Sequence, residues 1–198
     1  KPYAKNITKE FYSDLEAKYK NTKIIMTYEG EAVVMKSNSV KGILIRGLET
    51  RKVGEIDFFK KNIIDGNLSN FVNDSIIIGK YLAIELGVVV GDTINIMSSS
   101  KVTTPMGLIL KQSPYKIAAV FSSGLYEFDR NVTFLNLEDS LSFFDKTNEN
   151  VTIDIFLKNP LIADKYKNEI QKNNPNFNVN SWSDLNKSFF SALKVERN

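Results

Sequence analysis

The sequence contains no cysteine and no histidine. It therefore has no thiol nucleophile, no imidazole base, no thiolate zinc site and no histidine-ligated metal. No apolar run approaches the roughly 18 residues that a membrane-spanning helix requires. The 26 basic and 23 acidic residues are interleaved, so the net charge of +3 provides no strong field for a nucleic acid. Carboxylate chemistry remains possible.

The pattern of apolar residues predicts an α+β protein. The 198 residues suffice for one large domain or two small lobes, and a start at Lys1 rather than Met is typical of a segment of a longer protein. The expected helices cover 8–20, 79–86, 137–144, a segment that begins at 160, and 184–198. The expected strands cover 23–28, 31–35, 42–46, 75–78, 92–97, 115–121, 132–135, 151–157 and 177–180.

Helices and strands at both ends of the chain enclose a strand-rich middle. The simplest assembly is an α+β lobe built from residues 1–56 and 148–198, with a β-rich lobe inserted at 57–147. Both termini would then lie near each other on one lobe. Gly87 follows the helix expected at 79–86 and is suited to a left-handed C-terminal cap.

The connection between the strands expected at 92–97 and 115–121 is long and has an apolar centre. Such connections are normally short and polar at the tip. Pro105 and Pro114 restrict its backbone and remove two N–H donors. The apolar residues of its centre are Met106, Leu108, Ile109 and Leu110. Two interpretations stay open: a protruding loop that docks onto a partner, and a long hairpin that folds back onto the core.

Two pairs of acidic residues could act as general acid and base, namely Glu127 with Asp129 and Glu138 with Asp139. Solvated acids in turns and at a helix start explain both pairs more simply. The serines at 98–100 lie in no G-x-S-x-G frame and have no histidine to activate them, so we interpret them as serines of a flexible loop. The glycine spacing fits no phosphate-binding motif.

Several segments resemble a family of bacterial membrane proteins. The residues at 76–79, 82–83, 86–88 and 91–94 resemble the periplasmic domains of MacB-like ABC transporter permeases. The Thr-Pro-Met-Gly run at 104–107, the strand at 115–121 and the segment at 135–139 resemble, more narrowly, the lipoprotein-releasing permeases of the LolC/LolE family. The segments at 42–48, 182–184 and 189–197 fit the same family. The resemblance covers nearly the whole chain, and the Thr-Pro-Met-Gly run is its most specific part.

This resemblance implies a periplasmic segment between the first and second membrane helices of an inner-membrane permease. It would have a split porter-like lobe and an inserted sabre-like lobe with a protruding hook loop at 101–114. The permease would release lipoproteins, work with a cytoplasmic ATPase and a second permease subunit, and pass its cargo to the carrier chaperone LolA. The segment itself would be no enzyme and would bind no cofactor, because the ATPase subunit would use the ATP.

In the family, the hook captures the carrier. The expected hook residues are Thr104, Pro105, Met106, Gly107, Leu108, Ile109 and Leu110, with Gln112 as a flanking polar contact. The family also has arginines near the base of the hook, where this sequence has Asn95 and Ser113. This departure implies a weaker or co-adapted contact with the carrier.

Two alternatives have different requirements. A related MacB-type or FtsX-type permease, which exports another substrate or regulates a cell-wall hydrolase, is expected to lack the Thr-Pro-Met-Gly loop. A carboxylate-based hydrolase would need Glu127 and Asp129 to face Glu138 or Asp139 across a pocket.

Overall fold

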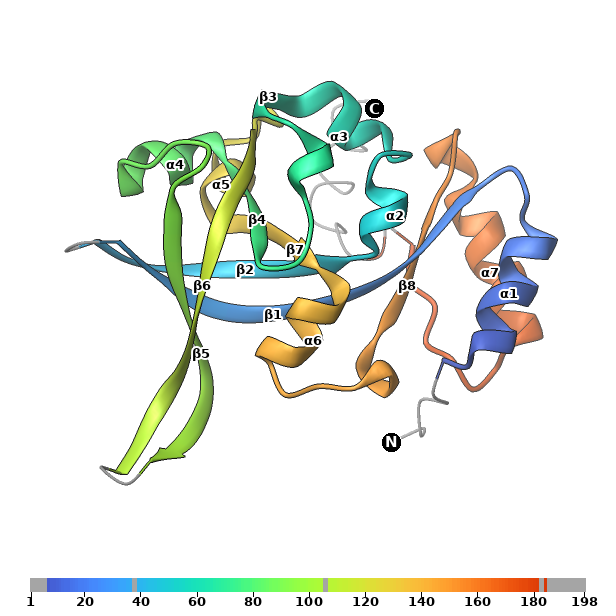
Figure 1. Ribbon diagram of the computed structural model, residues 1–198. Coiled ribbons are helices and arrows are strands. Elements are labelled where there is room, and N and C mark those ends of the chain that lie inside the picture. Colours follow the sequence, from blue (N-terminus) through green and yellow to red (C-terminus); the bar gives the residue numbers. More distant parts are fainter. Residues whose placement is uncertain (1–6, 37–38, 105–106, 182–183, 185–198) are drawn as a thin grey trace, which may run out of the picture. The chain divides into compact units, whose positions relative to one another are not determined.

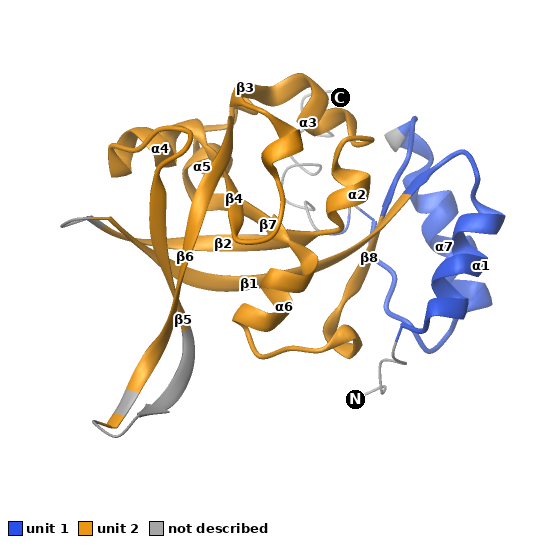
Figure 2. Cartoon of the chain, in the orientation of Figure 1, with its two compact units in different colours: residues 1–23, 155–198 blue, residues 24–154 orange. Residues whose placement is uncertain are grey.

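A computed structural model describes residues 7–36, 39–104, 107–181 and 184. It separates into two compact units (Figure 2). Unit 1 combines residues 1–23 and 155–198 from the two ends of the chain, and unit 2 comprises residues 24–154. Among the residues described, no helix is both long and apolar enough to cross a membrane.

Unit 2 is built on one mixed sheet (Figure 1). The strands are β1 (Lys23–Lys36), β2 (Ser39–Leu48), β3 (Ile63–Gly66), β4 (Ser75–Gly79), β5 (Thr93–Thr104), β6 (Gly107–Phe121), β7 (Val132–Asn136) and β8 (Thr152–Phe156). Their order is β2-β7-β4-β6-β5-β1-β8, and β3 pairs with β6. Because β2 also pairs with β1, the strands β1, β2, β7, β4, β6 and β5 form a closed ring. The pairs β2–β7 and β4–β6 are parallel.

The ring explains why the predicted division of the chain differs from the one in the structure. The prediction joined residues 24–56 to the chain ends, with boundaries after 56 and 147. In the structure the units change after residues 23 and 154. The strands β1 and β2 hydrogen-bond to each other, and they pair with β5 and β7 respectively. Their backbone groups are therefore satisfied within unit 2.

Short helices surround the sheet of unit 2. They are α2 (Thr50–Val53), α3 (Asp57–Asn62), α4 (Lys80–Leu86), α5 (Tyr126–Asn131) and α6 (Leu137–Phe143), with 3-10 turns at Leu68–Asn70 and Asn148–Asn150. Two apolar cores result from the period-two alternation of strands. On β4, Ile76 and Ile78 belong to one core and Ile77 to the other, and all three are fully buried. The prediction of a short buried strand at 75–78 is thus confirmed.

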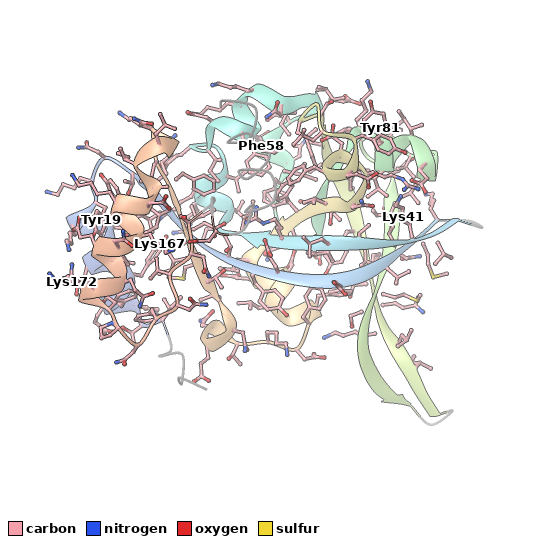
Figure 3. The ribbon with its side chains drawn as sticks, turned by 180° about the vertical axis from the view of Figure 1, so that it is seen from behind. Tyr19, Lys41, Phe58, Tyr81, Lys167 and Lys172 are labelled. Atoms are coloured by element: carbon pink, nitrogen blue, oxygen red, sulfur yellow. The ribbon has the colours of Figure 1, made fainter. Side chains whose placement is uncertain are left out.

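The second core is rich in aromatic rings. Phe58 on α3 (Figure 3) is partly buried against this core, and its ring centroid lies 5.1–6.0 Å from those of four other phenylalanines. Edge-to-face pairs of this kind add to the free energy of apolar burial. The four partners are Phe59, Phe121, Phe128 and Phe134. No regular element was predicted at 57–71 or 126–131, where α3, β3 and α5 lie.

Unit 1 contains α1 (Lys9–Lys18), a 3-10 turn at Pro160–Ile162, and α7 (Ala163–Asn173). Thr8 caps α1 by accepting a hydrogen bond from the N–H of Phe11 at 3.2 Å. The Phe11 ring stacks on Phe177, with centroids 4.5 Å apart. Tyr19 donates a hydrogen bond to Glu169 at 2.9 Å. The helices predicted at both positions are therefore confirmed, whereas the helix predicted at 184–198 lies outside the described residues apart from Asp184.

The prediction of a strand at 177–180 is wrong. This segment has no regular secondary structure. The Gln171 side chain takes the place of a partner strand: its amide donates to the carbonyl of Phe177 at 2.7 Å and accepts from the N–H of Val179 at 3.0 Å. Side-chain amides can satisfy backbone groups without a ladder.

The break predicted between strands at 23–28 and 31–35 is also wrong. β1 runs unbroken through Gly30, where a Cβ atom would lie 2.6 Å from the ring of Phe144. Glycine is therefore a packing requirement here rather than a turn signal. Gly87, by contrast, forms the predicted left-handed cap, with φ 62° and ψ 44°.

The role of Gly30 gives a stability test. The variant Gly30→Val should lower the free energy of unfolding by about 1–3 kcal/mol, because the buried Phe144 ring must move. Urea unfolding followed by fluorescence measures this difference. Gly42→Val in the neighbouring strand is the matched control, since a Cβ atom added at Gly42 meets nothing within 4 Å. Equal stability of the two variants would contradict the packing argument.

Candidate functional site

The strands β5 and β6 extend beyond the ring as a two-stranded ribbon (Figure 1). β1 pairs with β5 only as far as Ser98. Beyond that point, residues 101–104 of β5 pair with residues 107–110 of β6. We call these eight residues the ribbon. Among the described strands, the ribbon residues pair with one another.

A β-bulge separates the ribbon from the ring. Met97 pairs with Gln112 and Lys101 pairs with Leu110, so the three serines at 98–100 lie opposite the single residue Lys111. Bulges bend a strand and increase its local twist. The interpretation of these serines as part of a flexible loop is wrong, because they lie within β5 and Ser98 is only 2% exposed.

The apolar side chains of the ribbon that the structure describes face solvent. Ile109 is 52% exposed and Leu110 is 41% exposed. Gln112, expected as a flanking contact, is also exposed. The described part of this segment is therefore a projecting ribbon whose apolar side chains remain accessible.

The tip of the ribbon is described only in part. Thr104 pairs with Gly107, and Gly107 has φ +116°, a conformation that favours glycine. The predicted hook residues Pro105 and Met106 lie outside the described residues, as do the side chains of Thr104 and Leu108.

Asn95 and Ser113 occupy the positions where the resembling family has arginines. Asn95 is opposite Pro114, and Ser113 is opposite Ile96. Because directly opposed residues of an antiparallel pair share a face, Asn95 and Ser113 lie on opposite faces of the β5–β6 pair. Asn95 is exposed, whereas Ser113 lies on the side of the buried Ile96. These two positions therefore do not form one polar surface.

The first pair of acidic residues is engaged in local structure. Asp129 is fully buried and accepts hydrogen bonds from the hydroxyl of Ser122 and from the N–H and hydroxyl of Ser123. Glu127 accepts a hydrogen bond from the side chain of Asn131 at 3.0 Å. Asp129 thus connects α5 to the loop that precedes it.

The second pair lies at the start of α6 and has different partners. Asp139 accepts hydrogen bonds from the N–H of Asp74 at 2.7 Å and from the side chain of Asn136 at 2.9 Å. Glu138 is exposed. Among the described residues, no group of three or more acidic side chains could hold a metal ion. The partners of both pairs support structural roles for these acids.

One residue that the sequence analysis did not single out lies at the base of the ribbon. Lys111 directs its amine to the carbonyl of Ser142 and to a carboxylate oxygen of Asp145, both at 2.6 Å. The signal in the sequence is a single lysine that ends the apolar run at 108–110. Its partners follow more than thirty positions later, so the pattern alone could not identify them.

Comparison with known proteins relates the sequence to lipoprotein-releasing systems. No family model matches the chain. The transmembrane protein LolC of Buchnera aphidicola subsp. Acyrthosiphon pisum is 30% identical over 170 residues, which cover 84% of this chain and 41% of that protein. LolC of Xylella fastidiosa is 29% identical over 149 residues, covering 74% and 33%. LolC of Neisseria meningitidis serogroup B is 22% identical over 181 residues, covering 84% and 41%. The chain thus spans less than half the length of these relatives.

Two solved structures share the fold. The periplasmic region of MacB from Actinobacillus actinomycetemcomitans superposes with a TM-score of 0.59 at 11% identity, covering 94% of this chain and 84% of that one. The extracellular domain of the ABC-type transporter YknZ from Gram-positive bacteria superposes with a TM-score of 0.54 at 14% identity, covering 89% and 87%. At these identities the likeness concerns the fold alone.

The burial of Asp139 leads to a prediction about pH. Burial raises the pKa of Asp139 above its ordinary value of 3.8, against the opposing effect of the Asp74 N–H. The folded protein therefore binds this proton more tightly than the unfolded chain does. The resulting contribution to stability is complete below pH 3.8 and is lost as the pH rises through the raised pKa.

The variant Asp139→Asn isolates this contribution because it cannot titrate. We expect the free energy of unfolding of the wild type, relative to that of the variant, to fall as the pH rises from 3 towards neutrality. Urea unfolding at a series of pH values measures it. A relative stability that rises with pH would mean that the carboxylate form is favoured on folding.

Proposed function

The chain belongs to the LolC/LolE family of ABC transporter permeases and has the MacB-like fold, and on this premise we propose that it is the periplasmic domain of a lipoprotein-releasing permease in the bacterial inner membrane. Membrane helices outside this segment would anchor it. The segment itself catalyses no reaction and holds no cofactor in this proposal. ATP is hydrolysed by a separate cytoplasmic subunit, and a second permease subunit completes the complex.

The ribbon is the hook that recruits a LolA-type carrier in this proposal. The observation that carries it is the exposure of Ile109 and Leu110 on strands whose described pairings, beyond the ring, are with each other. Because each of these side chains is already about half buried, its complete burial in an apolar cavity of the carrier would contribute roughly 1 kcal/mol. The paired strands would also lose little conformational entropy on docking, because their backbones are already ordered.

The tip of the ribbon would make apolar contacts with the carrier, and its flank would make polar contacts. Met106 is suited to an irregular apolar pocket because its side chain is unbranched and polarisable. Gln112 supplies a polar contact beside the ribbon. Asn95 and Ser113, which replace the arginines of the family, leave this contact without its charged component. The released lipoprotein would pass from the permease to the carrier held in this way.

A related permease of the MacB or FtsX type, with export or hydrolase regulation as its role, is the second candidate. The fold itself does not separate the two candidates, because MacB and YknZ share it and are named without reference to lipoproteins. Carrier binding separates the two candidates, since only a lipoprotein-releasing permease is expected to bind a LolA-type carrier.

The proposal predicts the effect of a charge on the ribbon. Ile109→Asp should weaken binding to the LolA-type carrier of the same organism by roughly 10- to 100-fold, because a desolvated carboxylate replaces an apolar anchor. The melting temperature should stay within about 2 °C of the wild type, since the side chain is already half exposed. Isothermal titration and circular dichroism measure the two quantities. Met106→Asp should have the same effect on binding.

Ile84→Asp is the matched control. Ile84 lies on α4 and is 66% exposed, so it introduces the same charge at an accessible site away from the ribbon. Carrier affinity should be unchanged in this variant. Full carrier binding by Ile109→Asp would contradict the role of the ribbon, and no binding by the wild type would contradict the proposed function.

A further inference from the structure

We propose that Lys111 is a positioning residue that fixes the direction in which the ribbon leaves unit 2. Its effect on carrier capture rests on the proposed function, whereas its effect on the ribbon does not. Figure 1 shows β5 and β6 continuing past the other strands of the ring. Lys111 lies on β6 at the point where that departure begins.

The bulge makes this point the weakest part of the β5–β6 pair. Three residues of β5 lie opposite Lys111 alone, so the regular ladder is interrupted between Met97–Gln112 and Lys101–Leu110. A two-stranded ribbon without a third strand or a covered face is only marginally stable in water. The ladder itself therefore leaves the angle of the ribbon weakly determined.

The side chain of Lys111 supplies a second attachment across this interruption. Its amine lies 2.6 Å from the carbonyl of Ser142 and 2.6 Å from a carboxylate oxygen of Asp145. Ser142 belongs to the last turn of α6, where a positive charge is favoured, and its carbonyl also accepts a hydrogen bond from the N–H of Asp145 at 3.3 Å. The lysine side chain is 24% exposed, so its aliphatic part is largely covered.

The helix α6 is a firm anchor for this attachment. Its first turn is capped by Asn136, which accepts from the N–H of Asp139 at 2.7 Å. Its C-terminal end is held by the buried rings of Phe143 and Phe144. Along its side it packs so closely on β2 that a Cβ atom at Gly47 would overlap Ser140. The Lys111 side chain, which is bound to the end of α6, is therefore held at a fixed position in unit 2.

The contacts of Lys111 affect the direction of the ribbon more than they affect the stability of the whole protein. Ion pairs with an exposed partner contribute little to global unfolding, and the Asp145 side chain is 61% exposed. The same small free energy suffices to favour one orientation of a hinged ribbon over others. Loss of Lys111 should therefore change the distribution of ribbon orientations without a large change in the melting temperature.

The absence of cysteine makes the test direct. Spin labels placed at Ile109→Cys on the ribbon and at Glu138→Cys on α6 report one distance distribution by pulsed electron paramagnetic resonance. Lys111→Met should broaden this distribution at least about two-fold, whereas Lys111→Arg, which retains the charge and the donors, should keep it narrow. Lys116→Met is the matched control, since Lys116 is an exposed lysine of the same strand and lies within the ring.

Carrier affinity is measured in the same variants without labels. Lys111→Met should weaken carrier binding about 3- to 10-fold, because only a fraction of the ribbon orientations is then competent to bind, and Lys111→Arg should restore it. If Lys111→Met lowers the melting temperature, Asp145→Asn is used instead, because it removes the charged partner of Lys111. This variant should also broaden the distribution of distances between the two spin labels. An unchanged distribution in both variants would overturn the proposal. A wild type that binds no carrier would overturn the proposed function and leave the resonance result to decide the role of Lys111.

Discussion

The structure depends on the continuity of one antiparallel pair, β5 with β6. At one end these strands belong to the closed ring, where Ile94, Ile96 and Ile117 are buried and every neighbouring strand contributes backbone hydrogen bonds. At the other end the same two strands continue past the last residue that β1 and β4 can pair with. The described apolar side chains of this outer part, Ile109 and Leu110, are exposed and belong to neither core. Their exposure follows from the difference in strand length.

In the proposed function, the ordered ribbon serves as the binding surface. The buried half of the pair holds the outer half in an extended conformation, so side chains such as Ile109 and Leu110 are presented without the entropy loss of folding on contact. The bulge at 98–100 sets this surface apart from the ring. Lys111 then connects the base of the ribbon to α6. The ribbon is therefore a structured extension of unit 2 rather than a surface loop.

The sequence predicted the parts of this design that depend on local chemistry. The left-handed cap at Gly87 and the strand at 75–78 were both evident from residue type and spacing. The errors concern side-chain contacts that residue type alone does not reveal: Gly30 accommodates the ring of Phe144, which is distant in the chain, and the nearby Gln171 replaces a strand for residues 177–179. The same reason explains the site. The apolar run between prolines left open a protruding loop and a hairpin folded onto the core. The bulge and the contacts of Lys111 depend on register and on α6, which the sequence does not show.

Site-specific photocrosslinking tests the central claim most directly. A photoreactive amino acid is placed at position 109 of the ribbon, or at position 84 of α4 for comparison, and the chain is irradiated with the LolA-type carrier of the same organism. The account predicts a covalent product with the carrier from position 109 and none from position 84. A carrier that binds but crosslinks from α4 and not from the ribbon would contradict it.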